Sequence, residues 1–271
     1  MKRLYIALVL IATFHNAFSK EKKSVENKDY YFDGKISRNV LENYLARSST
    51  FGSLLHLTLE DDLRMIKNTG VKFAGRAIWM WGGESKIDEL VWGGEPFAKK
   101  VHAIDPDIIL QGAIFEIVSK DVESVKIPPE VFKAFEVPQK VRNFDYEAML
   151  YPFGHRHNHW SKGSSVPDMS RLETRMWFFY VAKRWIDMGI EAIHFGQVEI
   201  MDDWDRRHRH WRDMMKKIRD YATKNARRHM VLTDAHVPSG GIVHEGKLMF
   251  DLHSFPSRPK SVKGQPYKAI L

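Results

Sequence analysis

Two glutamates follow apolar runs that are typical of buried strands, and together they could do acid–base chemistry. Glu116 ends the run that begins at Asp107, and Glu199 ends the run that begins at Ile190. Hydrolysis of a glycosidic bond requires one carboxyl group that protonates the leaving oxygen and a second that acts as nucleophile or base. We therefore predict that Glu116 and Glu199 are the catalytic pair of a glycoside hydrolase.

Further polar and aromatic side chains come directly after apolar runs, and we predict that they bind the substrate. Arg76 is expected to keep one catalytic carboxyl group ionised by its proximity. Gln197 precedes Glu199 by two residues, which places both on one side of a strand. The predicted substrate-binding residues are Arg76, Trp79, Trp81, Glu84, Gln197, Asp234, His236, Asp251 and His253.

The aromatic content also favours a sugar ligand. Eight Trp and nine Tyr occur in 271 residues, and several Trp stand beside polar residues in predicted loops, where their faces could stack on sugar rings. Four other Trp have the spacing of buried helix faces, and we expect them in the core: Trp177, Trp185, Trp204 and Trp211.

The histidines favour a different class of enzyme. Asp234 and His236 repeat the Asp-x-His spacing of Asp251 and His253, and with His194 they could ligate a divalent metal ion. This metal-dependent hydrolase is one alternative, and a non-catalytic carbohydrate-binding barrel is another. For the glycoside hydrolase that we favour, we predict no metal and no cofactor. The histidine clusters at 155–159 and 208–210 are expected to be solvated surface.

The elements that must position these residues alternate between strands and helices, which predicts a parallel α/β sheet. Residues 36–271 are expected to form a (β/α)8 TIM-type barrel, either irregularly closed or truncated at its C-terminus. The active site of such a barrel lies at the carboxyl ends of the strands. The predicted strands are 53–59, 73–81, 107–116, 146–151, 190–199 and 230–234, followed by a hairpin at 241–250.

The first nineteen residues have the pattern of a cleavable signal peptide. A basic start precedes the uncharged stretch Leu4–Phe14, and Ala17 and Ser19 supply the small residues before the cleavage point. Eleven residues are too few to span a bilayer, which needs about 20. The sequence therefore predicts export to the periplasm, the cell surface or the medium of a bacterium, with no membrane span after cleavage. Residues 20–35 are expected to be a flexible leader.

The charge and the absence of cysteine limit the kinds of partner and chemistry that we expect. The formal charge is +8, but the basic residues do not form a block interleaved with aromatics, so we expect no nucleic-acid partner. The chain has no cysteine, which excludes disulfides and thiol nucleophiles. The expected partner is an oligo- or polysaccharide.

Several runs resemble a family of exported bacterial (β/α)-barrel proteins that are glycoside-hydrolase-like and occur mostly in polysaccharide-degrading bacteria. The resemblance covers nearly the whole chain after the signal peptide, and it implies a barrel and a sugar context without assigning catalytic residues. The runs are ISRNVLENYL (36–45), FAGR (73–76), WGGE (81–84), AIHFGQ (192–197), LTDAH (232–236) and FDLHSFP (250–256).

Overall fold

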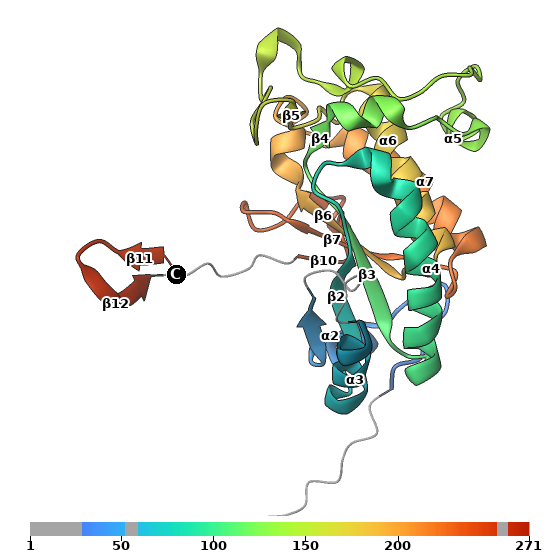
Figure 1. Cartoon of the computed structure of the whole chain (residues 1–271), viewed down its shortest axis with the longest axis vertical. Coiled ribbons are helices and arrows are strands. Elements are labelled where there is room, and N and C mark those ends of the chain that lie inside the picture. The colour runs from blue at the N-terminus through green and yellow to red at the C-terminus, as the bar shows by residue number, and fades with distance from the viewer. Residues whose placement is uncertain (1–28, 52–58, 254–259, 271) are drawn as a thin grey trace, which may run out of the picture.

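The computed structural model describes residues 29–51, 59–253 and 260–270 (Figure 1). The predicted signal peptide and most of the predicted leader lie outside these residues, as does most of the strand expected at 53–59.

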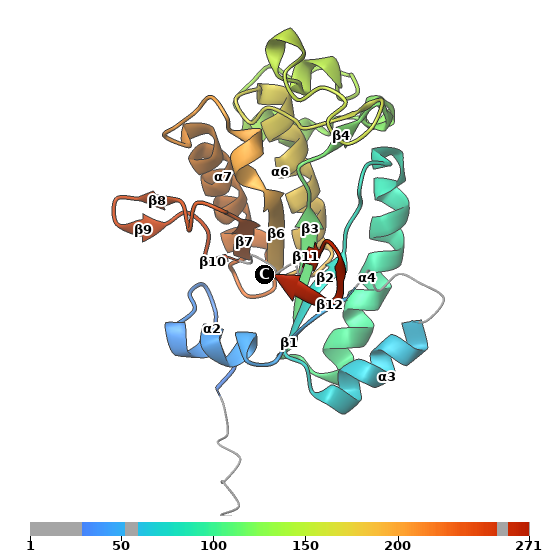
Figure 2. The same cartoon turned by 90° about the vertical axis from the view of Figure 1, so that its left-hand side faces the viewer.

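A curled, parallel half-barrel sheet forms the centre of the fold (Figure 2). Its six strands follow one another in space as they do along the chain, so every connection is a parallel crossover. The (β/α)8 prediction is confirmed only as far as this parallel α/β sheet, because the described residues contain no closed ring of eight strands. In order, the strands are β1 (Ser48–Thr50), β2 (Phe73–Ile78), β3 (Ile109–Ile114), β6 (Ala192–Gln197), β7 (Leu232–His236) and β10 (Leu252–His253).

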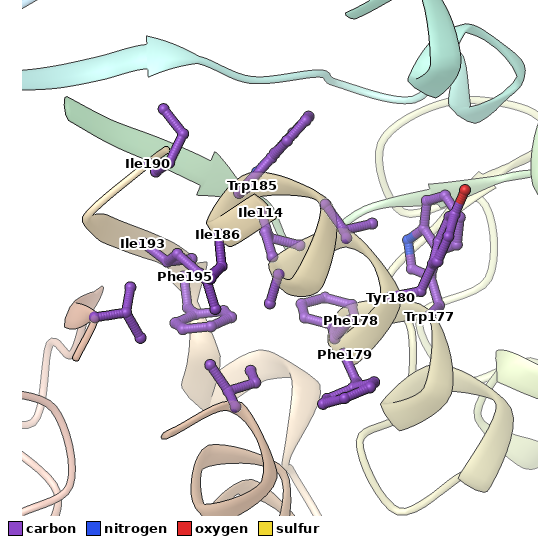
Figure 3. Close-up of a cluster of buried hydrophobic side chains, with 14 of the residues drawn as sticks. Ile114, Trp177, Phe178, Phe179, Tyr180, Trp185, Ile186, Ile190, Ile193 and Phe195 are labelled. Carbon is purple, nitrogen blue, oxygen red and sulfur yellow. The ribbon is translucent and has the colours of Figure 1, made fainter. Parts of the chain in front are cut away.

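Helices cover the sheet and bury its outer face. The largest buried cluster includes Ile114, Phe195 and the apolar face of the 172–187 helix, whose Phe178 and Trp185 lie against the strands (Figure 3). Gly112 permits this contact, since a Cβ there would lie 2.8 Å from the Trp185 ring. The covering helices are α3 (Leu59–Thr69), α4 (Ile87–Ile104), α6 (Leu172–Asp187) and α7 (Arg209–Asn225).

The amino ends of the strands are closed by helix α2 (Arg38–Leu45) and the segment before it. Ser37 caps this helix by accepting the Val40 N–H at 3.2 Å. Tyr44 and Phe32 pack onto the strand starts in a second buried cluster. Residues 29–35, expected to belong to a flexible leader, are therefore packed against the domain.

A long excursion between β3 and α6 lies beyond the carboxyl ends of the strands (Figure 1). The strand predicted at 146–151 is wrong: this stretch holds a single 3-10 turn, and Leu150 forms an isolated bridge with Pro167 instead of joining a sheet. The elements of the excursion are β4 (Val118–Ser119), η2 (Lys120–Ser124), α5 (Pro129–Ala134), η3 (Glu147–Met149), η4 (Pro152–Gly154) and β5 (Ser164–Ser165).

The C-terminal third contains the predicted hairpin, formed by β8 (Val243–His244) and β9 (Lys247–Leu248). The last described strands, β11 (Lys260–Val262) and β12 (Gln265–Ile270), pair antiparallel with each other. In the described residues these two strands form a sheet of their own, separate from the six-stranded parallel sheet. Across the described ranges, no helix is both long and apolar enough to span a membrane.

Candidate active site

A cavity of about 740 Å³ opens at the carboxyl ends of the strands. Its volume lies in the range of small-molecule sites. Six of the predicted site residues come together here: Arg76, Trp79, Trp81, Glu116, Gln197 and His236. Four further lining residues were not predicted: Thr50, Phe51, Phe115 and Trp160.

Glu116 is the carboxylate of this cavity. It follows β3, is only 3% exposed, and accepts the Gln197 N–H at Oε2 and the Gln197 Nε2 amide at Oε1, both at 2.8 Å. A Cβ on Gly196 would overlap Oε2, so the glycine lets the carboxylate lie against the backbone of β6. The main chain of the neighbouring strand thus fixes the orientation of Glu116.

Aromatic rings form one wall. The ring centroids of Trp81 and Trp160 are 4.9 Å apart, and those of Trp81 and Phe115 are 5.4 Å apart. Trp160 donates its indole N–H to the Glu116 carbonyl at 2.9 Å, which ties the excursion to the end of β3. Trp81 remains 44% exposed, so part of its surface is accessible to a ligand.

Arg76 and His236 form the polar side of the cavity. Arg76 Nη2 donates to His236 Nε2 at 3.2 Å, so this ring nitrogen is the acceptor. The Arg76 guanidinium also lies 5.6 Å from the Phe115 ring centroid. Arg76 was expected to keep one catalytic carboxyl group ionised by proximity; in the described residues no ion pair joins it to Glu116, whose oxygens accept from Gln197.

A buried hydrogen-bond network lies behind Arg76. Gln111 donates to Asp234 Oδ1 at 2.6 Å, and His194 Nδ1 donates to Asp234 Oδ2 at 2.8 Å. His194 and Asp234 are register partners on β6 and β7, which places their side chains together. Gln111 was not among the predicted site residues, and His194 was named only as a possible metal ligand; a polar residue inside an otherwise apolar strand is the signal that marks both.

This network lines a second cavity of about 510 Å³, which shares Thr50, Arg76 and His236 with the first. The two cavities therefore adjoin at Arg76 and His236, and the polar network lies on the concave side of the half-barrel.

Three predicted substrate-binding residues have structural roles elsewhere. Glu84 is 2% exposed and accepts hydrogen bonds from the Ser119 N–H, at 2.8 Å, and from the Ser119 hydroxyl. Burial raises the pKa of Glu84, although the Ser119 bonds oppose this. Asp251 accepts the N–H and hydroxyl of Thr233, each at 2.8 Å. His253, at the end of β10, packs against Gly241 and does not line the cavity with Glu116.

Glu199 does not line the cavity either. Strand β6 ends at Gln197, and the chain continues into the 3-10 turn η5 (Val198–Met201). The expectation that Gln197 and Glu199 share one side of a strand is therefore wrong. Glu199 is half-buried in this turn, at the same edge of the sheet.

The described ranges give no support to a metal site. They contain no group of three or more His, Asp or Glu side chains positioned to hold a metal ion. Of the residues proposed as ligands, Asp234 accepts from His194 and Gln111, while Asp251 accepts from Thr233.

Comparison with known proteins gives a partial structural likeness. No family model and no curated protein matches the chain. Among solved structures, the debranching enzyme from Nostoc punctiforme matches with a TM-score of 0.43 and 10% identity, over 72% of this chain and 41% of that one. The α-amylase from Geobacillus thermoleovorans matches with a TM-score of 0.40 and 14% identity, over 72% of this chain and 45% of that one. Trehalose-6-phosphate hydrolase from Bacillus licheniformis matches with a TM-score of 0.40 and 11% identity, over 66% of this chain and 40% of that one. This chain thus covers less than half the length of these structures.

Proposed function

We propose that this chain binds carbohydrate in the cavity around Glu116 and hydrolyses a glycosidic bond there. The observation that carries the proposal is a buried carboxylate held at the base of a cavity walled by Trp79, Trp81 and Trp160. Indole faces can stack on the C–H faces of a sugar ring, and the polar groups of the cavity can bind its hydroxyls.

Glu116 is the proposed acid–base residue. Its two oxygens already accept from Gln197, which leaves further lone pairs for a sugar hydroxyl or a transferred proton. Glu199 is the proposed second carboxyl group, because it lies in the turn that directly follows Gln197 and is half-buried. Among the described residues, Glu116 is the one carboxylate that lines the cavity. Because hydrolysis needs two carboxyl groups, the second candidate function is carbohydrate binding without catalysis.

The test compares Glu116→Gln and Glu199→Gln with the unaltered protein on a panel of polysaccharides and aryl glycosides. Loss of an acid–base group lowers turnover about 100- to 10,000-fold. Glu95→Gln, an exposed change on α4, is the matched control and is expected to have full activity.

The outcomes separate the candidate functions. Turnover lost in both Gln variants, with sugar binding retained, supports paired-carboxyl catalysis. Full turnover in Glu199→Gln removes this residue from the mechanism. Binding that depends on Trp81, with no turnover in any preparation, supports a binding protein, and the absence of both overturns the proposal.

We also propose that the protein acts outside the cytoplasm after cleavage behind Ser19, on the basis of the N-terminal sequence pattern. Mass spectrometry of the protein recovered from the periplasm or medium of an expressing bacterium tests this. A mature N-terminus at Lys20 is expected, whereas uncleaved protein retained in the cytoplasm would contradict it.

A further inference from the structure

Arg76 is aimed into the cavity by an unusual backbone. It has a φ of 53°, a conformation that non-glycine residues rarely adopt. The register between β2 and β3 shifts between Ala74 and Ile78, so Arg76 lies within a bulge. Bulges near active sites commonly redirect one side chain. The Gln111 side chain stabilises this conformation by accepting the Arg76 N–H at 3.0 Å.

The half-buried guanidinium of Arg76 forms no ion pair with a described residue, although Glu116 and Asp234 line the same cavities. Its contacts are the His236 ring nitrogen and the face of Phe115. No described carboxylate lies within ion-pair distance of Arg76, whereas several other arginines with little exposure pair with one, as Arg142 does with Glu173 and Arg228 with Glu191. Removing a cation from water without a counter-ion is costly. An anionic ligand would supply the missing charge.

A second basic and aromatic surface follows β6, between η5 and α7. Trp204 is 55% exposed there, and it lines a hollow of about 570 Å³ with Arg206, Arg207 and Arg209 and with two aspartates that are paired, Asp203 with Arg156 and Asp205 with Arg209. Of these three arginines, Arg209 alone forms an ion pair within the described residues, and its partner is Asp205. Trp204 was expected in the core, but it precedes helix α7 and stacks on His155 with 5.2 Å between ring centroids.

From these observations we infer that the carbohydrate is acidic, with Arg76 binding a carboxylate or sulfate group on the sugar unit that occupies the cavity. The planar guanidinium offers paired N–H donors that match the oxygens of either group. Trp204 and its neighbouring arginines fit further units of the same acidic chain. This inference rests on the proposed carbohydrate-binding function.

The test is titration calorimetry of the whole protein with three probes: a uronic-acid oligosaccharide, a sulfated neutral oligosaccharide, and the same neutral oligosaccharide without sulfate. At least one acidic probe is expected to bind more tightly than the neutral one. Arg76→Gln should weaken that probe about 10- to 100-fold, the usual effect of losing a charge-assisted contact. The neutral probe should change less than threefold.

Two further variants complete the design. Arg76→Lys keeps the charge but loses the paired donors, so it should recover part of the affinity. Arg38→Gln, an exposed change on α2, should bind all three probes like the unaltered protein. Thermal unfolding of each variant excludes loss of the fold as the cause.

The probe that shows the Arg76 dependence identifies the anionic group as carboxylate or sulfate. Equal binding of neutral and acidic probes, or acidic binding that Arg76→Gln leaves unchanged, overturns the inference while the proposed function stands. Failure of all three probes to bind overturns the inference and counts against the proposed function.

Discussion

Both carboxylate oxygens of Glu116 are held by one neighbouring residue, Gln197, through its backbone N–H and its side-chain amide at 2.8 Å each. Glu116 follows β3 and Gln197 ends β6, and the two strands are paired as far as Ile114 and Phe195. Glu116 itself lies in a bend two residues beyond β3, and its carboxylate is held by the last residue of a strand. A site built on strands is held more precisely than one built on loops.

A methyl group at Gly196 should displace this carboxylate. The added Cβ of Gly196→Ala would overlap Glu116 Oε2 and lie 2.8 Å from its Cδ, so both bonds to Gln197 must break or bend. We expect sugar binding or turnover to fall at least about tenfold, and the melting temperature to fall by several degrees, because buried polar groups lose their partners. Activity assays and thermal unfolding measure the two effects.

The double variant Gly196→Ala/Glu116→Ala tests the cause of that loss. If the clash with the carboxylate is responsible, truncating Glu116 should restore much of the stability that Gly196→Ala removes. Additive losses in the double variant would show that the methyl group acts on another neighbour.

The buried Asp234 should stabilise the fold and position Arg76 indirectly. Asp234 accepts from Gln111 and His194, and Gln111 in turn accepts the Arg76 N–H. Asp234→Ala leaves the buried donors of Gln111 and His194 without this acceptor, and we expect a loss of about 1–3 kcal/mol for each in the free energy of unfolding. Chemical denaturation measures this loss.

A surface aspartate provides the control for Asp234. Asp220 forms an exposed helical pair with Lys216, and Asp220→Asn should cost less than about 0.5 kcal/mol. A similarly small loss for Asp234→Ala would show that the network does not stabilise the fold.

Glu84 should affect stability and not sugar binding. Its carboxylate joins the turn at η1 (Glu84–Lys86) to Ser119 at the start of the excursion. Glu84→Ala leaves the Ser119 N–H without its acceptor, which costs about 1–3 kcal/mol. Glu84→Gln keeps one acceptor oxygen and should lose less. Calorimetric titration of Glu84→Gln with sugar tests whether binding is unaffected. An affinity about tenfold weaker would show that Glu84 does contribute to sugar binding.

The sequence pattern located the groups that end strands but not those in turns. Glu116, Gln197 and His236 were found because each ends or follows an apolar run, and the parallel sheet brings such ends to one edge. Glu199 was misplaced because the strand predicted to reach it ends two residues earlier, at Gln197, and Glu199 lies in the 3-10 turn that follows. The difference is set by local backbone geometry, which the apolar pattern does not encode.

Long-range partners explain the other differences. Ser170 and Glu173 have the spacing of a capping box, yet Glu173 accepts from both Nη atoms of Arg142 and from the Asp145 N–H. The helix therefore begins at Leu172 without a side-chain cap. Glu173 therefore pairs with Arg142, 31 residues earlier, instead of forming the local capping bond. This contact exists only when the excursion folds back onto the helix, so the local sequence does not predict it.

The buried Asp202 should make stability depend on pH. Asp202 is 6% exposed, and its Oδ2 accepts from His208 Nδ1 at 2.6 Å, while its buried Oδ1 has no described partner. Burial raises the pKa of Asp202 from 3.8 to about 7, although the His208 bond opposes this rise. Between these values the folded state binds a proton that the unfolded chain releases. The free energy of unfolding should therefore fall as pH rises from about 4 to 7.

Substitution by asparagine separates this effect from other titrating groups. Asp202→Asn resembles the protonated side chain, so it should keep at pH 8 the stability that the unaltered protein loses, a few kcal/mol at most, since one pKa unit is about 1.4 kcal/mol. Asp203 is the matched control with the opposite sign, because its bonds from Arg156 and His155 outweigh burial and lower its pKa. Asp203→Asn should lose stability at neutral pH and approach the unaltered protein as the pH falls below 4. Urea denaturation from about pH 2 to 8 measures all three proteins. Curves of stability against pH that run parallel for Asp202→Asn and the unaltered protein would contradict the assignment, because Asp202 would then contribute nothing to the pH dependence.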